Sequence, residues 1–400
     1  MESYNIFTLP NGLRVVHVPS ESPVGYCGVV VGAGSRNDGE ALGLAHFVEH
    51  TLFKGTAKHR ASYINNRMEQ LGGYLDAYTT KERTVVYSGF PKEYLRRAMS
   101  LIADMTQNSV FPNRELELER EVVMEEAAGY RDTPSEAIFD DFSDLLGKGS
   151  DLGHNILGTA DSVAAIESSH CRQFLETYYT PSNMVLFVQG QYTEPEVQKL
   201  AAACFTSPAT ATAIQRPEVT AHRFEEEMNF GLHQCHVVLG APVFSRHDDR
   251  IYALSLLNNI LGGPCNSLLN IALRERRGWV YTVESGCSHY CDCGLFYVYF
   301  GCDHNKAHKS LKLVRQIIGD LAQTRISEAK LEAAKRRKCG TALFEGENPE
   351  SYAISSGAML LNYGSMRYQK EEIERIKALT DDDIRACAEL LLPSSTLIFR

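Results

Sequence analysis

The stretch Gly43-Leu44-Ala45-His46-Phe47-Val48-Glu49-His50-Thr51-Leu52-Phe53 carries two histidines and a glutamate inside an otherwise apolar run. If the run is helical, His46 and His50 lie one turn apart on the same face, with Glu49 beside them. Two imidazoles at that spacing can bind one zinc ion, and a neighbouring carboxylate can take a proton from a zinc-bound water. The order His-x-x-Glu-His is the reverse of the commoner zinc-binding order His-Glu-x-x-His. A third ligand has to be found, because the alternative interpretation is a helix whose histidines face the core.

The composition is that of a globular protein large enough for two domains. Its 400 residues are too many for one ordinary core. A content of 44% hydrophobic and 22% charged residues is typical of a globular chain. The net charge of −10 argues against nucleic acid or an anionic membrane as the main partner. It fits a solvated acidic surface, or a cavity that receives basic peptides. No apolar run reaches the length that a membrane span requires.

The cysteines and the first residues favour a cytoplasmic location. The eleven cysteines are an odd number scattered through predicted helices and strands, which is typical of reduced thiols. The opening residues show neither the basic nor the apolar region of a signal peptide. Four cysteines between 287 and 302 resemble a metal cluster. However, residues 288–290 and 294–300 look like two strands of a hairpin, so we favour placing the tight pair of cysteines at its turn.

Hydrophobic periodicity predicts a mixture of strands and helices. Strands are predicted at 4–9, 13–18, 27–32, 74–78, 84–90, 184–188, 236–239 and 280–302. Helices are predicted over the histidine stretch and at 61–71, 91–105, 113–132, 135–146, 161–178, 250–261, 306–323 and 327–346. The predicted fold class is α+β, with two similar domains that are each a mostly antiparallel sheet packed with helices.

Residues 206–220 are the best linker candidate, because they lack periodicity and are rich in small residues and proline. They divide the chain into a predicted N-terminal zinc domain, 1–205, and a C-terminal domain, 221–400. A faint repeat supports two copies of one fold. Its two occurrences, 215 residues apart, are Asp132-Thr133-Pro134-Ser135-Glu136 and Glu347-Asn348-Pro349-Glu350-Ser351.

The repeat predicts a single metal site. At the same offset His50 corresponds to Cys265 and Glu126 corresponds to Thr341. The C-terminal domain is therefore expected to be a degenerate copy without metal ligands, and the chain is expected to bind one zinc ion.

A third ligand is available on the long charged helix predicted at 113–132. Glu119 and Glu126 are seven residues apart, which places them two turns apart on one face together with Val122 and Val123. A carboxylate on such a semi-buried face needs a partner, for example a metal ion or a histidine N–H. Most acidic residues on a charged helix are simply solvated, so the residues alone leave both interpretations open.

Further motifs accompany the histidine stretch along most of the chain. They are Leu52-Phe53-Lys54-Gly55-Thr56, Leu71-Gly72-Gly73-Tyr74, Asp76-Ala77-Tyr78-Thr79, the Glu-Arg-x-Val-Val-x-x-Glu block at 119–126, and Leu273-Arg274-Glu275 with Gly278 and Tyr281. Together these motifs resemble the pitrilysin/insulinase family of zinc peptidases, in its half-length branch that includes the mitochondrial processing peptidase. The resemblance covers both predicted domains, and the combination of motifs is specific.

The resemblance implies a complete zinc site. His46, His50 and Glu126 match the family's three ligands, and Glu126 follows His50 by the family's spacing. Glu119 matches a supporting glutamate two helical turns upstream of the third ligand. Glu49 matches no ligand and is expected to act as the general base that activates the attacking water.

The resemblance also implies residues that contact the substrate. The segment that contains Asp76, Ala77 and Tyr78 matches an edge strand to which an extended peptide adds through backbone hydrogen bonds. Asp76 stands where the family usually has asparagine, so the amide donor is missing. Arg274 and Tyr281 match a pair that closes over the substrate, and a tyrosine hydroxyl aimed at the developing oxyanion would stabilise the transition state.

The predicted function is that of a zinc-dependent endopeptidase, a metalloprotease that cleaves unstructured peptides in an enclosed dimeric chamber. Relatives of this size need four such domains for the chamber, so Arg274 and Tyr281 are expected to reach the zinc site of a second subunit in a homodimer. One alternative is a heterodimer with an inactive homologue. Another is a non-catalytic peptide-binding scaffold, which the complete set of motif residues argues against.

Overall fold

The computed structural model describes residues 4–210, 214, 216 and 219–400, and these residues form two compact units. The first unit is drawn from residues 4–128, 154–216 and 346–366, and the second from 129–153, 219–345 and 367–400. Six residues of the predicted linker 206–220, namely 211–213, 215, 217 and 218, lie outside the described residues.

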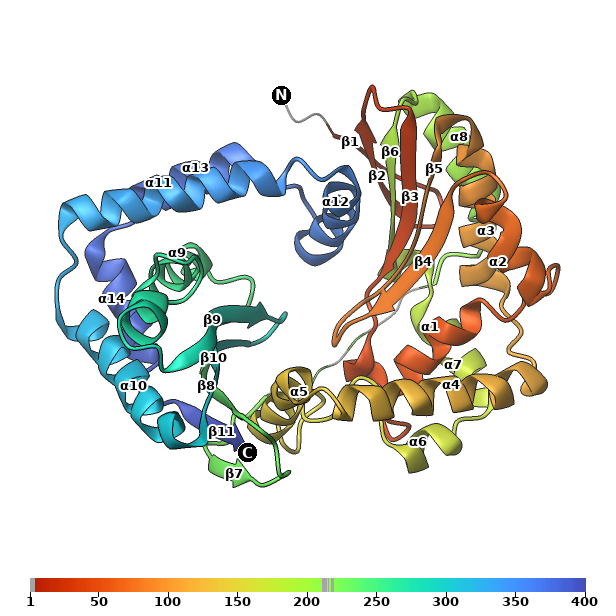
Figure 1. Ribbon diagram of the computed structural model, residues 1–400. Coiled ribbons are helices and arrows are strands. Elements are labelled where there is room, and N and C mark those ends of the chain that lie inside the picture. The colour runs from red at the N-terminus through yellow and green to blue at the C-terminus, as the bar shows by residue number, and fades with distance from the viewer. Residues whose placement is uncertain (1–3, 211–213, 215, 217–218) are drawn as a thin grey trace. The chain divides into compact units, whose positions relative to one another are not determined.

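The first unit is built on a six-stranded, mostly antiparallel sheet (Figure 1). The strand order is β1-β2-β6-β3-β5-β4, and only β2 and β6 run parallel. The strands are β1 (Asn5–Thr8), β2 (Arg14–Pro19), β3 (Val24–Val31), β4 (Tyr74–Thr79), β5 (Thr84–Pro91) and β6 (Met184–Gly190). Strand β4 therefore lies at one edge of the sheet.

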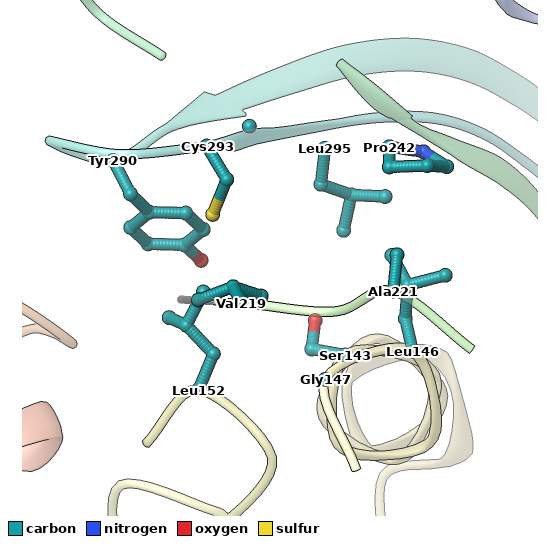
Figure 2. A pocket seen from close by; sticks show the side chains of 11 residues that line it. Ser143, Leu146, Gly147, Leu152, Val219, Ala221, Pro242, Tyr290, Cys293 and Leu295 are labelled. Atoms are coloured by element: carbon teal, nitrogen blue, oxygen red, sulfur yellow. The ribbon is translucent and has the colours of Figure 1, made fainter. Parts of the chain in front are cut away.

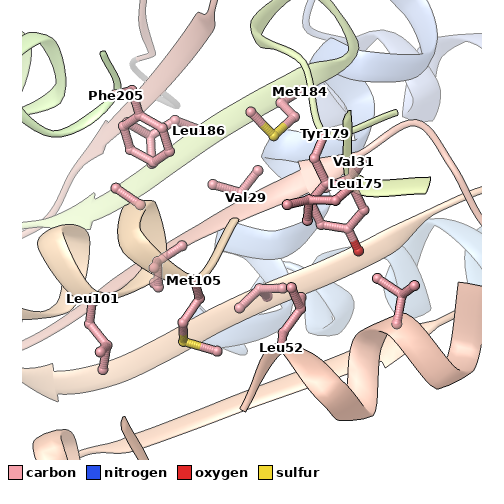
Figure 3. Close-up of a cluster of buried hydrophobic side chains, with 14 of the residues drawn as sticks. Val29, Val31, Leu52, Leu101, Met105, Leu175, Tyr179, Met184, Leu186 and Phe205 are labelled. Carbon is pink, nitrogen blue, oxygen red and sulfur yellow. The ribbon is translucent and has the colours of Figure 1, made fainter. Parts of the chain in front are cut away.

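Most helices of the first unit share a core with one face of this sheet. Because side chains alternate along a strand, Val29 and Val31 of β3 enter this core while Val30 faces the opposite side. Figure 3 shows Leu52 of the histidine helix in the same cluster as Met105 and Leu186. The helices are α1 (Leu44–Leu52), α2 (Ala61–Glu69), α3 (Leu95–Asn108), α4 (Asn113–Arg131), α6 (Ala160–Ala164), α7 (Ser168–Tyr178) and α8 (Glu194–Cys204).

Helix α12 (Pro349–Tyr363) covers the other face of the same sheet. Ala353 and Leu360 are buried in one cluster with Val30 and Phe187. A Cβ atom on Gly357 would lie 2.9 Å from the Phe187 side chain, so the helix packs closely on the strands. The central strands are consequently buried on both faces, which explains their unbroken apolar runs.

The second unit repeats this plan with a five-stranded sheet of order β7-β11-β8-β10-β9, in which only β7 and β11 are parallel. Its strands are β7 (Glu225–Met228), β8 (Cys235–Val243), β9 (Val280–His289), β10 (Gly294–Cys302) and β11 (Ser395–Phe399). Its helices are α5 (Pro134–Leu146), α9 (Ile251–Leu261), the π-helix η4 (Asn270–Glu275), α10 (Ala307–Gln323), α11 (Glu328–Glu345), α13 (Gln369–Ala378) and α14 (Asp381–Leu390). The predicted α+β fold of two sheets packed with helices is confirmed. No helix in the described ranges combines the length and apolarity that crossing a bilayer would need.

Each sheet receives one covering helix from the other half of the chain. Helix α5 follows α4 but packs in the second unit, where Phe142 is buried with Val238 and Leu397. Helix α12 follows α11 but packs in the first unit. Both helices begin with a proline, Pro134 and Pro349, at the two occurrences of the sequence repeat. The compact units therefore differ from the contiguous ranges 1–205 and 221–400, because periodicity does not tell which sheet a helix covers.

Candidate metal centre

Helix α1 begins at a glycine with a left-handed backbone. Gly43 has a φ of +88°, and a Cβ atom there would lie 2.7 Å from the carbonyl oxygen of Leu157. The buried carboxylate of Asp38 accepts the N–H groups of Gly43 at 2.7 Å and Ala45 at 2.8 Å. The first N–H groups of a helix have no acceptor within the helix. Asp38 supplies acceptors for two of them, which stabilises the positive end of α1 and fixes its first turn.

Gly43→Ala is expected to lower the free energy of unfolding by about 3 kcal/mol, because the new Cβ adds a steric clash to the cost of the left-handed backbone. Gly39→Ala is the matched control: Gly39 has a φ of +64° but open space around its Cβ position, so about 1 kcal/mol is expected. Denaturant unfolding measures both variants. Equal losses would contradict a close approach at Gly43.

The three residues predicted as ligands lie together in the first unit. The rings of His46 and His50, one turn apart on α1, have centroids separated by 4.5 Å. The Oε2 atom of Glu126, on α4, lies 3.8 Å from His46 Nε2 and 3.4 Å from His50 Nε2. One candidate ligand atom from each residue lies within 4.8 Å of the other two. Two imidazole nitrogens and one carboxylate oxygen are the donor set of a catalytic zinc site, which keeps one position open.

Helix α4 presents Glu119 and Glu126 on the face that packs within the first unit. Leu116, Glu119 and Val123 are buried along this face. Val122, which the sequence placed beside them, is 49% exposed, because only the i+4 position continues the buried stripe. Packing along this stripe brings Glu119 and Glu126, two turns apart on α4, to the two ring nitrogens of His50.

Glu119 holds the second histidine in place. Its Oε1 atom lies 2.8 Å from His50 Nδ1, and its Oε2 atom lies 2.5 Å from the Lys54 ammonium. Burial alone would raise the pKa of Glu119, but the hydrogen bonds from His50 and Lys54 lower it, so the carboxylate is charged. A carboxylate at Nδ1 draws the ring proton to that nitrogen, which leaves the lone pair of Nε2 directed toward Glu126.

The two histidines differ in their environment. Burial, reinforced by the neighbouring His50, lowers the pKa of His46 to about 3, so its imidazole is neutral and able to bind a metal. Burial would also lower the pKa of His50, but Glu119 and the surrounding carboxylates raise it instead. The Nδ1 atom of His46 is buried and has no hydrogen-bond partner among the described residues. The ring of His50 is thus oriented by a neighbour, whereas that of His46 is held by packing.

Glu49 lies beside the ligands and is almost fully buried, with 8% of the residue exposed. Thr79, the last residue of β4, donates a hydrogen bond to its Oε2 atom at 3.0 Å. Burial raises the pKa of Glu49 to about 7, with smaller contributions from Glu126 and Asp76. A carboxyl group whose pKa lies near neutrality can both take and return a proton.

The predicted substrate strand is β4, whose outer edge pairs with no strand in the described part of the chain. The N–H of Ala77 donates to its neighbour Asp76 at 2.8 Å, so it points to the open edge rather than to β5. The other carboxylate oxygen of Asp76 accepts the Tyr87 hydroxyl at 3.2 Å. Tyr78 is partly buried against Tyr87, and burial raises its pKa. Where an asparagine could donate through its amide, Asp76 instead accepts two hydrogen bonds, one at each carboxylate oxygen.

The remaining predicted residues lie in the second unit. Arg274 is exposed on the π-helix η4, and Tyr281 is exposed near the start of β9. Both lie where the backbone departs from regular geometry, which is common at functional positions.

The cysteine-rich segment forms the predicted hairpin. Strands β9 and β10 pair directly, and the turn between them is closed by the N–H of Tyr290, which donates to Cys293 at 2.8 Å. No disulfide bond joins any of the eleven cysteines, all of which lie in the described ranges. Figure 2 shows Tyr290 and Cys293 above a small apolar cavity of about 60 Å³ that also borders Leu146 and Leu152. A cavity of this size is too small to hold a peptide.

Sequence reasoning missed three side chains that support the centre. Lys54 follows His50 by four residues, a spacing that could have indicated a shared partner. Thr79 belongs to the motif at 76–79, but neither it nor Asp38 carried a signal for contact with α1, because these contacts come from distant segments of the chain.

Two models of known protein families match this chain, one in each half. Residues 14–160 match the insulinase family, peptidase family M16, and residues 165–338 match the domain described as the peptidase M16 inactive domain. An uncharacterized zinc protease of Streptomyces coelicolor is 32% identical over 98% of this chain and 88% of its own length. The uncharacterized zinc protease YmxG of Bacillus subtilis is 30% identical over 96% of this chain and 95% of its own.

Solved structures share the whole fold. A peptidase M16 inactive domain from Pseudomonas fluorescens superposes with a TM-score of 0.92 at 20% identity, over 99% of this chain and 97% of that one. A protease from Helicobacter pylori also gives a TM-score of 0.92, at 22% identity, over 100% of this chain and 99% of that one.

Proposed function

Because this chain belongs to the insulinase family of peptidases, family M16, we propose that it is a zinc-dependent endopeptidase. The observation that carries the proposal is the cluster of His46, His50 and Glu126 with the buried Glu49 beside it. The names of the relatives, zinc proteases, support the same metal and the same class of reaction.

The two histidines and Glu126 would hold one zinc ion. Their donor set fits this metal, because the neutral imidazole of His46 and the oriented imidazole of His50 both turn Nε2 to the same carboxylate. When bound, zinc supplies Lewis acidity, which polarises a peptide carbonyl and lowers the pKa of water. The second unit lacks a histidine at the position that corresponds to His50, so one ion per chain is proposed.

Glu49 would act as general base and then as general acid. Thr79 occupies its Oε2 atom, which leaves Oε1 to take a proton from the attacking water. The same carboxyl group then returns the proton to the leaving amine. Its burial matters because a carboxylate with an ordinary pKa would be a weaker base toward the attacking water.

The open edge of β4 would bind the substrate backbone. An extended peptide that adds to this edge takes the Ala77 N–H as a donor, in place of the Asp76 carboxylate that now accepts it. This mode of binding requires an unfolded segment, since a folded protein offers no free strand. The substrate class we propose is therefore unstructured peptides.

Glu119→Gln is expected to weaken zinc binding by about 10- to 100-fold, because the amide no longer holds the His50 ring with a full charge. Glu121→Gln is the matched control, since Glu121 is exposed on the same helix. Competition with a chromogenic chelator measures both affinities. An unchanged affinity in Glu119→Gln would contradict the orienting role of this carboxylate.

We propose a homodimer in which Arg274 and Tyr281 complete the active site of the second subunit. We also propose a cytoplasmic location, which eleven cysteines without a disulfide bond among the described residues support. The alternative assembly is a heterodimer with an inactive homologue. Sizing of the purified chain, combined with a peptide-cleavage assay, separates the two. A chain that is active and dimeric alone supports the homodimer, whereas a chain that becomes active only with a homologue supports the heterodimer.

A further inference from the structure

Tyr281 is the extra residue of a β-bulge at the start of β9. In the pairing with β10, Gly301 lies opposite Thr282 and Cys302 lies opposite Val280, so Tyr281 has no opposite residue. A bulge removes the extra residue from the regular alternation of the strand and turns its side chain in a new direction. Tyr281 is 57% exposed, an unusual setting for a large aromatic side chain between two paired residues.

The backbone that leads to Tyr281 is fixed by a tight connection. The N–H of Gly278 donates to the Arg274 carbonyl, and the N–H of Trp279 donates to the Leu273 carbonyl, both at 2.9 Å. Gly278 has a φ of +56°, the left-handed conformation that allows the chain to leave the π-helix η4 and enter β9. The position of Tyr281 is therefore set by hydrogen bonds on its N-terminal side and by the bulge itself.

Asp303 holds the end of the tyrosine side chain. The Tyr281 hydroxyl donates to Asp303 Oδ1 at 2.5 Å. Asp303 follows the last residue of β10, and its carbonyl accepts the N–H of Lys306 at 2.9 Å, so it stands on a closed turn. The hydrogen bond with Asp303, reinforced by its negative charge, raises the pKa of Tyr281, which keeps the hydroxyl protonated and able to donate.

This contact offers little to folding, because both side chains are exposed and water competes for each partner. What it does provide is direction: an exposed tyrosine ring that could rotate freely is held in one orientation. Fixing a group before the reaction removes the cost of ordering it during the reaction.

We propose that Asp303 is a positioning residue, which holds the Tyr281 hydroxyl in place until the hydroxyl turns to the oxyanion that develops on the substrate. The proposal rests on the proposed peptidase function. During the reaction the hydroxyl would exchange one anionic acceptor, the Asp303 carboxylate, for another, the substrate oxygen. Asparagine at position 303 keeps a carbonyl oxygen as acceptor, whereas alanine leaves the hydroxyl without a partner on this side.

The kinetic test compares single variants with a double variant. Asp303→Ala is expected to lower kcat by about tenfold with little change in KM, and Asp303→Asn by only about threefold. In the Tyr281→Phe background, Asp303→Ala is expected to cause no further loss, because its effect passes through the hydroxyl. Asp320→Ala, at an exposed aspartate on α10, is the control for surface charge. Independent, multiplying losses from the two substitutions would overturn the proposal, and so would a full kcat in Asp303→Ala.

A second measurement does not depend on activity. In protein labelled with 13Cζ-tyrosine, the Tyr281 signal is identified by its loss in Tyr281→Phe, and its pH titration is followed by NMR. The titration midpoint of Tyr281 is expected above that of an ordinary tyrosine in the parent and lower in Asp303→Ala. An identical titration midpoint in both proteins would show that Asp303 does not hold the Tyr281 hydroxyl, which would overturn the proposal. A zinc-loaded parent that cleaves no peptide would overturn the proposed function instead, while the NMR result would still decide whether Asp303 holds Tyr281.

Discussion

Glu49→Gln is expected to abolish peptide cleavage, with a loss in kcat of about a thousandfold or more, while zinc binding stays at the parent level. The amide cannot take a proton from water, so the substitution removes the proposed general base. Its size is almost unchanged, and its carbonyl oxygen can still accept the Thr79 hydroxyl. The ligands are untouched, which is why the metal content should not change. Peptide turnover and bound zinc are measured on the same preparation.

The control for this variant is Glu69→Gln, which makes the same chemical change at an exposed position of α2. It is expected to keep both zinc and turnover. Cleavage by Glu49→Gln at a rate comparable to the parent would remove Glu49 from the mechanism. A variant that lost zinc as well would instead assign Glu49 a role in binding the metal.

The second large effect is expected from Glu126→Ala, which should weaken zinc binding by more than about a hundredfold and abolish cleavage as a consequence. Glu126 supplies the only candidate carboxylate ligand in the cluster, and the two histidines alone cannot complete the site. Zinc affinity by chelator competition and cleavage of a model peptide report the loss.

Glu125→Ala is the matched control, because Glu125 is the adjacent acidic residue on α4 and is exposed. The two residues differ in direction rather than in chemistry, since neighbours on a helix point about 100° apart. Equal losses from both variants would show that α4 contributes general negative charge and not a specific ligand.

Much of the candidate site could be predicted because its signals are local. The spacing of His46 and His50 is one helical turn, and that of Glu119 and Glu126 is two, so each pair is placed on one face by helix geometry alone. The meeting of the two helices did not follow from periodicity. It was the resemblance to a peptidase family that connected them, and the structure brings the same residues together.

The side chains that support the centre could not be predicted in the same way. Asp38 and Thr79 contact α1 from a loop and from the edge strand, and nothing in their local sequence specifies these distant partners. Within a helix, the sequence alone likewise did not distinguish the burial of Val122 from that of Val123. Both are apolar neighbours, and only packing against the first unit decides that Val123 is buried and Val122 is exposed.

Local sequence patterns also did not predict that α5 and α12 each pack on the sheet of the other half of the chain. The repeat located the starts of α5 and α12, yet it did not tell which sheet each helix covers. One sequence signal was available: the apolar runs Val29-Val30-Val31 and Met184-Val185-Leu186-Phe187-Val188 indicate strands that are buried on both faces. A sheet of that kind needs a cover on its second face, and in the first unit α12 provides it.

The most direct test of the zinc peptidase proposal is the digestion of a mixed peptide library, read by mass spectrometry, before and after zinc is removed with a chelator. The purified chain is expected to cleave unstructured peptides, to lose this activity with the chelator, and to regain it when one equivalent of zinc per chain is returned. Cleavage that continues unchanged in the chelated protein, or that does not return with zinc, would contradict a catalytic zinc held by His46, His50 and Glu126.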